Sequence, residues 1–334
     1  MSKNVTIKEI AKELNISATA VSRALRDMPD ISQETKQKVR LQADKMKYKK
    51  NQLASTLRTQ RSNTVGFIMP DIDNPVFGSM YKGAESICKA KGYTVIFSTT
   101  NDNGKDERQA IEAMMNHQID GFIICPSLKN PDNIRLLKNS GIPFVTIGRD
   151  IYDENVCSVL AKDTTGGYEI CRHLLSRGYK SFLYLTKEMT FPPAHDRYEG
   201  FCQCLAENKI SSSALKVKEC DLSFDSAYKA ISEMSNDLKE TRAIFAFNDV
   251  MAIGVLKYLN DYGYKVPEDI AVVGYDNIES CEFVSPSLTT VDLLGYTQGS
   301  EGMKLLFELI NKGSVEDDKK HIIFSPNVVK RKSS

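Results

Sequence analysis

Short apolar runs alternate with helical patterns over most of this chain, from Thr64 almost to its end. Strands that are buried on both faces read as continuous apolar runs, and helices are the usual connections between parallel strands. We therefore expect an α/β fold in which parallel sheets are flanked by helices. The expected strands are VGFIM, YTVIF, DGFIIC, FVTIG, SFLYL, VKEC, AIFAF and IAVVGYD, and the expected helices span 75–91, 105–117, 131–139, 165–177, 195–208, 225–236 and 249–262.

The alternation breaks near Ser158 and then resumes, which divides the expected strands into two sheets. A chain of 334 residues is long enough for a small domain and a large domain of two lobes. In open parallel sheets, ligands bind at the carboxyl ends of the strands. We therefore expect a ligand-binding cleft where the carboxyl ends of the two sheets meet.

Polar and charged side chains collect just after the expected strands, where such a cleft would present them. Asp, Asn and Arg side chains around an aromatic face are typical of sites for small hydroxylated ligands. Any one of these residues could be an ordinary polar loop residue, but their shared placement favours a site for a small polar effector. They are Asp71, Asp73 and Asn74, Arg149 and Asp150, Asn248 and Asp249, and Asp276 and Asn277.

Charge is distributed unevenly along the chain. Residues 1–62 contain 14 Lys and Arg against 6 Asp and Glu, a net charge of +8, whereas the remainder contains 30 against 37, a net charge of −7. A small basic segment attached to an acidic body is what binding to a phosphate backbone by one domain requires. A solvated basic tail is the alternative, but the helical periodicity of the segment argues against it.

The basic segment has the pattern of three short helices. Thr6 and Glu9 form a capping box that starts the first, Ser17 follows a turn and starts the second, and Ser32 starts the third. Apolar residues at helical spacing follow each start. They are Ile7, Ile10, Ala11 and Leu14, then Val21, Ala24 and Leu25, then Val39, Ala43 and Met46. We therefore predict a helix-turn-helix headpiece that spans 1–46.

The exposed face of the expected second helix has side chains suited to reading base edges. Short side chains let a helix sit deep in the major groove, where Thr and Ser hydrogen-bond to bases, Ala contacts a thymine methyl and Arg pairs with guanine. A helix-turn-helix can also serve as a scaffold or a protein contact, but the charge of this segment favours DNA. The expected DNA-binding residues of the headpiece are Thr6, Ser17, Ala18, Thr19, Ser22 and Arg23.

A basic linker, 47–62, connects the headpiece to the first expected strand. Its central part could form about two helical turns, which is too short for a helix that is stable alone. Two such helices, one from each subunit of a dimer, could pack through Ala54 and insert Leu57 into a minor-groove base step. Asn51 is a further expected DNA contact. An unstructured basic linker is the alternative.

Several segments resemble the lactose-repressor (LacI/GalR) family of transcriptional regulators. They are VTIKEIAKELNISATAVSRAL and NQLASTLRTQRSNTVGF in the N-terminal part, and DIDNPVF, AKDTTGG, HDRYEGF, FAFNDVMAIG, VVGYDN, PSLTTV and NVVKRKS in the large domain. The resemblance implies that Leu57 is the minor-groove lever and that Ala18, Thr19 and Arg23 face the bases. Ala20 departs from it, because the family commonly has Thr there.

The resemblance also implies a domain plan. The headpiece and the hinge precede a periplasmic-binding-protein-like core at 63–334, which binds an effector and forms dimers through the helix at 75–91 and nearby elements. The chain would cross between the lobes near residues 160, 290 and 322. The expected N-terminal lobe is about 63–160 and 292–322, and the expected C-terminal lobe is about 161–291 and 323–334.

Within that core, the resemblance implies effector contacts from Phe77, Arg197, Asn248 and Asp276. The strand-end residues Asn74 and Arg149 are expected to join them, as is Leu222, which occupies a position where relatives often have an aromatic residue. Three positions depart from the family pattern. Gly148 stands where many relatives have an acidic residue, and Leu222 and Val76 stand where they often have aromatic ones. These departures argue against a standard sugar-stacking pocket, and they leave an anionic effector or a protein corepressor open beside a sugar or a related metabolite.

Other functional classes lack their signatures. No G-x-S-x-G, P-loop or H-E-x-x-H motif occurs, so we expect no enzyme, no catalytic residues, no cofactor and no metal. The eight scattered cysteines are expected to be reduced core thiols. No apolar run could span a membrane and no secretory signal is evident, so we expect a cytoplasmic protein rather than a free-standing solute receptor.

The sequence thus predicts a transcription regulator, most simply a repressor of carbohydrate or related catabolic genes. It would bind a near-palindromic operator in double-stranded DNA as a homodimer or a tetramer. The effector would act through its different affinities for two arrangements of the lobes, which would change the spacing of the paired hinge helices. The sequence leaves open whether the effector induces or corepresses.

Overall fold

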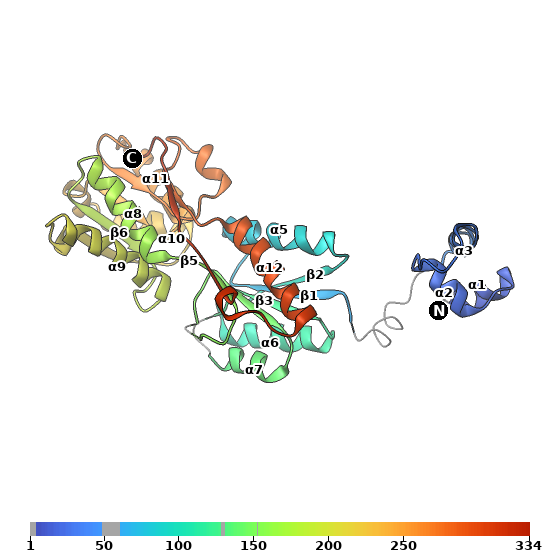
Figure 1. Ribbon diagram of the computed structural model, residues 1–334. Helices are drawn as coiled ribbons and strands as arrows, with labels where there is room; N and C mark the ends of the chain where they lie inside the picture. Colours follow the sequence, from blue (N-terminus) through green and yellow to red (C-terminus); the bar gives the residue numbers. More distant parts are fainter. Residues whose placement is uncertain (1–4, 49–60, 128–130, 152) are drawn as a thin grey trace. The chain divides into compact units, whose positions relative to one another are not determined.

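The computed structural model describes residues 5–48, 61–127, 131–151 and 153–334 (Figure 1). The chain separates into two compact units, Met1–Ser62 and Asn63–Ser334. The predicted hinge residues Asn51, Ala54 and Leu57 lie outside the described residues, so their roles stay predictions.

The N-terminal unit contains the three predicted helices, α1 (Ile7–Leu14), α2 (Ala18–Leu25) and α3 (Gln33–Lys45). Each begins at its predicted cap. Thr6 and Glu9 form the capping box, and Ser17 and Ser32 each accept a hydrogen bond from the backbone amide three residues later. These bonds satisfy amides that the start of a helix otherwise leaves without an intrahelical partner.

The three helices enclose one small apolar core. Its buried residues are Ile10, Ala11, Val21, Ala24, Val39 and Ala43. Between α1 and α2, Asn15 adopts a φ of 49°, a left-handed conformation that Asn tolerates better than most residues. This turn and the shared core hold one face of α2 inward, so the opposite face lies at the surface of the unit.

The larger unit contains a six-stranded sheet in the order β11-β5-β4-β3-β1-β2, in which every neighbouring pair is parallel. The strands are β1 (Thr64–Met69), β2 (Thr94–Thr99), β3 (Gly121–Ile124), β4 (Phe144–Ile147), β5 (Ser158–Ala161) and β11 (His321–Phe324). β1, β3 and β4 are almost wholly buried, as expected for strands that helices cover on both faces. We call this sheet and its helices the N-terminal lobe.

Four helices belong to this lobe: α5 (Pro75–Ala90), α6 (Gly104–Asn116), α7 (Asp132–Ser140) and α12 (Gly295–Lys312). α5 and α12 pack tightly against each other (Figure 1). A Cβ on Gly83 would lie 2.0 Å from the carbonyl oxygen of Tyr296, and one on Gly299 would lie 1.8 Å from that of Met80. Glycine at these positions therefore permits the close approach. The strand–helix alternation predicted α5, α6 and α7 but not α12.

The C-terminal lobe is built on a four-stranded parallel sheet in the order β7-β6-β8-β9. Its strands are β6 (Phe182–Thr186), β7 (Leu215–Glu219), β8 (Ala243–Ala246) and β9 (Ala271–Val273). α8 (Asp163–Ser176) packs with α9 (Pro192–Glu207), and α10 (Phe224–Glu233) packs with α11 (Asp249–Asp261). Short 3-10 helices span Ser212–Ala214, Asp237–Lys239, Glu279–Glu282 and Asp317–Lys319.

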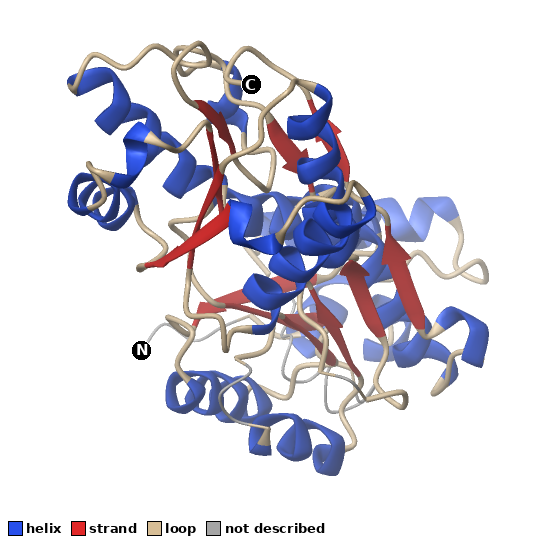
Figure 2. Ribbon diagram, turned by 90° about the vertical axis from the view of Figure 1, so that its left-hand side faces the viewer, coloured by secondary structure: helices blue, strands red, loops and turns tan. Residues whose placement is uncertain are grey.

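Three connections join the two lobes. They run from β5 to α8, from β10 (Thr290–Asp292) to α12, and from β11 to β12 (Asn327–Val329), where β10 and β12 form an antiparallel pair. Figure 2 shows the strands between layers of helices. The predicted α/β architecture of helix-turn-helix headpiece and two-lobed core is confirmed. All eight cysteines are free, and six of them are buried.

Candidate DNA-reading surface and ligand cleft

The surface of α2 carries the residues that the sequence predicts to contact DNA. Thr19 is exposed, whereas Ala18, Ser22 and Arg23 are half-buried. Ser17 is exposed too, but its hydroxyl is already used, because it accepts a hydrogen bond from the amide of Ala20 at 3.0 Å. Ser17 therefore starts the helix. Its hydroxyl can still donate its own hydrogen to a nucleic acid.

Thr6 has a similar local role at the start of α1. Its amide donates to Glu9 Oε2 at 2.7 Å, and its hydroxyl accepts from the amide of Glu9 at 3.3 Å. Free amides and the positive end of the helix dipole make the start of a helix suitable for phosphate contact. Here the Glu9 carboxylate already accepts the hydrogen bond from the Thr6 amide, so that amide is not available to a phosphate.

Two carboxylates lie in the loop between α2 and α3. Asp30 forms an ion pair with Arg23 of α2, with Oδ2 and Nη2 2.6 Å apart. Asp27 instead pairs with Lys36 and Arg40 of α3, each at 3.1 Å. The loop is thus tied to both helices by charge, and the predicted base-reading guanidinium is one of the partners.

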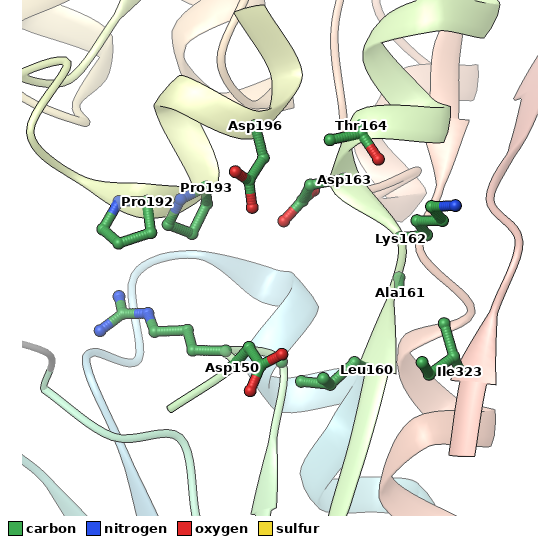
Figure 3. A pocket seen from close by; sticks show the side chains of 12 residues that line it. Asp150, Leu160, Ala161, Lys162, Asp163, Thr164, Pro192, Pro193, Asp196 and Ile323 are labelled. Carbon is green, nitrogen blue, oxygen red and sulfur yellow. The ribbon is translucent and has the colours of Figure 1, made fainter. Parts of the chain in front are cut away.

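A cavity lies in the larger unit where the carboxyl ends of the two sheets meet. Both lobes contribute to its lining. The residues from the N-terminal lobe are Gly148, Arg149, Asp150, Leu160, Ala161 and Ile323, and those from the C-terminal lobe are Lys162, Asp163, Thr164, Pro192, Pro193 and Asp196. Figure 3 shows the carboxylates of Asp163 and Asp196 beside each other, facing Asp150 and Leu160. The cavity lies at the predicted place in the fold, and carboxylates prevail in its lining.

Arg149 and Asp150, both expected at the cleft from their place after a strand, line this cavity. The Arg149 guanidinium is buried, and its Nη1 donates to Asp102 Oδ1 at 2.5 Å and to the carbonyl oxygen of Pro126 at 3.0 Å. The other oxygen of Asp102 accepts from Lys187 Nζ of the C-terminal lobe at 2.8 Å. Burial alone would raise the pKa of Asp102, but Arg149 and Lys187 outweigh it and hold that pKa below its usual value.

Arg197 is buried beside the cavity rather than in its lining. Its Nε donates to Asp163 Oδ1 at 2.8 Å, and its Nη1 donates to the carbonyl oxygen of Phe247 at 2.5 Å. The guanidinium carbon lies 3.6 Å from the ring centroid of Tyr275 and 4.2 Å from that of Phe247. This aromatic cage holds the cation in position, and the cation in turn orients Asp163, whose side chain reaches the cavity.

Asn74 and Asp276 join the two lobes outside the lining of this cavity. Asn74 caps α5 through its Oδ1, and its Nδ2 donates to Asp276 Oδ2 at 2.8 Å. Burial raises the pKa of Asp276 to about 8, so this carboxyl is largely protonated at neutral pH. Asp276 also has a φ of 111°, a strained conformation for a residue other than glycine, and such strain is found most often at functional sites.

The remaining predicted effector residues serve mainly local structure. Asn248 is buried and caps α11 by accepting a hydrogen bond from the amide of Met251 at 2.9 Å. Phe77 and Leu222 are half-buried and pack against the main apolar core. None of these three lines the cavity.

Sequence reasoning did not select most of the cavity lining. Asp163 and Thr164 follow β5, a strand of four residues that the alternation did not predict. Asp196 lies in the first turns of α9, one residue before the selected Arg197. The signal was present in the segments AKDTTGG and HDRYEGF, but a polar residue inside a helix pattern does not by itself indicate which way it faces.

Among the described residues, no helix is long and apolar enough to cross a membrane.

Two family models match this chain. The model of periplasmic binding proteins and the sugar-binding domain of the LacI family matches residues 62–330, and the model of bacterial regulatory proteins of the lacI family matches residues 6–51. The match to the sugar-binding domain begins at residue 62, which is also where the first of the two compact units ends.

The chain is similar over its length to characterised and solved proteins. The HTH-type transcriptional repressor PurR of Mannheimia succiniciproducens is 28% identical over 330 residues, which cover 98% of each chain. A LacI family transcriptional regulator from Enterococcus faecium, solved with bound ribose, is 29% identical, with a TM-score of 0.75 over 81% of this chain and 98% of that one. The lac repressor dimer bound to operator and the anti-inducer ONPF has a TM-score of 0.87 over 99% of both chains, and at 22% identity it supports the fold alone.

Proposed function

Because the chain belongs to the lacI family of bacterial regulatory proteins, we propose that it represses genes of carbohydrate or related catabolism by binding an operator under the control of a small-molecule effector. The observation that carries this proposal is the combination of a basic three-helix headpiece with a two-lobed core that has a cavity between its sheets. A regulator needs both parts, since one reads DNA and the other senses the effector. The protein acts by binding rather than as an enzyme, and it works in the cytoplasm, where the DNA is.

The headpiece contacts DNA through α2. Thr19 and Ser22 offer hydroxyls, Ala18 offers a methyl group and Arg23 offers a guanidinium, which suit base edges in the major groove. Thr6, Ser17 and Asn51 contribute further contacts, and Ala54 and Leu57 act at the minor groove. The excess of basic residues in 1–62 supplies the attraction to phosphates, which weakens as salt rises.

The effector is a neutral polyhydroxylated molecule, such as a sugar, rather than an anion. Three carboxylates, those of Asp150, Asp163 and Asp196, line the cavity beside two cations, Arg149 and Lys162, and carboxylates accept hydrogen bonds from hydroxyl groups. Arg149 is already paired with Asp102 and Asp163 with Arg197, and the lining holds more carboxylates than cations, which makes it less favourable to an anion. The other predicted effector residues complete the site, either by binding the effector directly or by holding the lining side chains in position as the lobes close. They are Asn74, Phe77, Arg197, Leu222, Asn248 and Asp276.

The protein acts as a homodimer. Large apolar side chains are exposed on the larger unit, among them Phe283 at 78% and Tyr296 at 51%. Tyr296 contacts α5, since its hydroxyl donates to Ser86 Oγ at 3.1 Å. Aromatic side chains are enriched in protein–protein contacts, so these residues are candidates for the contact between subunits. Sedimentation should give a dimer or a tetramer, and Phe283→Arg should shift the mass toward the monomer.

DNA binding is tested by selecting ligands from a random duplex library with the full-length protein. We expect a near-palindromic site whose affinity falls steeply between 50 and 200 mM salt, by roughly a thousandfold or more if 6 to 10 phosphates are contacted. Arg23→Ala should weaken binding to this site more than binding to random DNA. A protein that enriches no sequence, with or without added metabolites, would refute the regulator.

The effector class is tested by the thermal shift of the full-length protein with three panels: neutral sugars, phosphosugars and organic acids. We expect a shift with a neutral sugar, and we expect calorimetry to show weaker binding of that sugar to Asp196→Asn. Asp225→Asn, a change of an exposed carboxylate at the start of α10, is the matched control and should bind normally. A shift with phosphosugars or organic acids alone would refute the neutral effector and leave DNA binding untouched.

A further inference from the structure

We propose that Asp30 is a positioning residue that holds the Arg23 guanidinium for reading one base pair, and that it thereby contributes to sequence discrimination without touching a base. This inference rests on the proposed binding of DNA through α2. It assigns a role to a residue that lies on the loop between α2 and α3 rather than on the recognition helix itself.

The geometry begins with the ion pair. Asp30 Oδ2 lies 2.6 Å from Arg23 Nη2, and this bond holds the pKa of Asp30 below its usual value. The Nε atom of Arg23 is buried and forms no hydrogen bond among the described residues. The stem of the side chain therefore lies against the protein, and its head is held at one Nη. In the free protein the ion pair thus favours one orientation of the Arg23 guanidinium.

Stability is a poor explanation for this pair. The two side chains are 40% and 48% exposed, and ion pairs this exposed contribute little to folding because water and salt screen them. The other carboxylate of the loop, Asp27, already ties the loop to α3 through Lys36 and Arg40. What the pair with Asp30 adds is a direction for the guanidinium.

Direction matters because arginine reads guanine through a planar fork of two N–H groups. A guanidinium has five N–H groups, so Asp30 can hold one on Nη2 and leave the others of the two Nη atoms for a base. A free arginine loses much rotamer freedom when it binds, whereas one that an ion pair already orients loses less. Asp30 also places a negative charge near the DNA, which opposes binding to any phosphate backbone. Both effects favour the correct sequence over random DNA.

The test uses the full-length protein and the site that it selects from a random duplex library. Each G·C pair of the site is exchanged for A·T in turn, and the loss of affinity is measured for the wild type and for Arg23→Lys. The pair read by Arg23 is the one at which the exchange weakens the wild type most and Arg23→Lys least. We expect Asp30→Ala to reduce discrimination at that pair by about tenfold or more, within the range of one bidentate contact, while affinity for random DNA stays equal or rises. Glu34→Ala is the matched control, because Glu34 is an exposed carboxylate nearby, at the start of α3, that pairs with Lys38.

Glu34→Ala should leave discrimination at that pair unchanged. In an Arg23→Lys background, Asp30→Ala should cause no further loss, because the two residues act as one unit. Asp30→Asn, which keeps the size and an acceptor oxygen, is measured in parallel and should retain more discrimination than Asp30→Ala. Wild-type discrimination by both Asp30 variants would overturn the proposal, and so would a loss of equal size in Glu34→Ala. If the wild type selects no site at all, the proposed regulator fails rather than the role of Asp30.

Discussion

Lys187 of the C-terminal lobe donates a hydrogen bond to Asp102 of the N-terminal lobe, with 2.8 Å between Nζ and Oδ2. The ring of Phe191 lies beside both cations of the cluster, 4.6 Å from Lys187 Nζ and 4.9 Å from the guanidinium carbon of Arg149. The side chains of Lys187 and Asp102 are 19% and 17% exposed, so solvent screens them less than it screens a surface pair. This bond therefore stabilises the observed arrangement of the two lobes.

Lys187→Met should loosen that arrangement in the protein without effector. Hydrogen bonds between charged groups contribute roughly 1.5–3 kcal/mol, so we expect backbone amides of the loops around Asp102 and Phe191 to exchange about tenfold faster. Hydrogen exchange read by mass spectrometry measures this. Lys216→Met is the control, because Lys216 pairs with Asp237 and Glu240 of its own lobe. Unchanged protection of both loops in Lys187→Met would contradict the role of the bond.

Stability should fall as the pH rises from 6.5 to 8.5, and Asp276 should cause part of the fall, up to its pKa of about 8. Burial raises its pKa to about 8, whereas in the unfolded chain an Asp has a pKa near 4. Between these values the unfolded chain has released a proton that the folded protein retains, so each step up in pH favours unfolding. The pKa of Asp249, about 6, and that of His173, about 4, place their own effects below this range.

Calorimetric melting of the full-length protein at pH 6.5 and 8.5 measures this dependence. We expect the melting temperature to fall by several degrees in the wild type and by clearly less in Asp276→Asn, which has no proton to lose. Asp225→Asn, an exposed carboxylate of the same lobe, should keep the wild-type dependence. An identical fall in Asp276→Asn would mean that other groups carry the effect.

Gly167→Ala should destabilise the C-terminal lobe by about 2 kcal/mol or more. A Cβ at this position would lie 1.9 Å from the carbonyl oxygen of Arg197, so α8 and α9 would have to move apart. Chemical unfolding measures the loss. Gly78→Ala is the control, since a Cβ there meets nothing within 4 Å and alanine favours a helix over glycine by about 1 kcal/mol. Equal stability of the two variants would contradict the tight packing of α8 on α9.

Thr6→Ala should weaken α1 by about 1 kcal/mol, because it removes the hydroxyl that accepts from the amide of Glu9. The amides of the first turn should then exchange roughly fivefold faster in the full-length protein, while those of α3 should be less affected. Lys8→Ala changes an exposed residue of the same helix and should leave exchange nearly unchanged. Equal exchange in Thr6→Ala and the wild type would mean that the shared core alone determines the stability of α1.

Local patterns in the sequence were enough to predict most elements of the fold. The caps at Thr6, Ser17 and Ser32 act through bonds that span three residues, so their geometry follows from the neighbouring sequence alone. The strands β1, β3 and β8 can likewise be recognised from the local sequence as apolar runs, because a strand covered on both faces has few polar residues. The helix α12 was not predicted, because no expected strand precedes or follows it in the sequence. In the structure it packs on the sheet through β3, β4 and β5.

The cleft was predicted as a place but not as a set of side chains. Asn74 and Asp276 are 202 residues apart, and Asp102 and Lys187 are 85 apart, so neither pair has a local signature. Their contacts depend on how two sheets and three crossing segments pack, and burial then determines which carboxyls keep a proton. The sequence by itself determined the basic headpiece and most of the helices and strands, though not α12 or β5, because short-range hydrogen bonds and apolar periodicity depend on neighbouring residues. Only the tertiary structure decided that Asp163 and Asp196 join Asp150 in the lining of one cavity while Arg197 lies behind it, because the direction of a side chain depends on long-range packing.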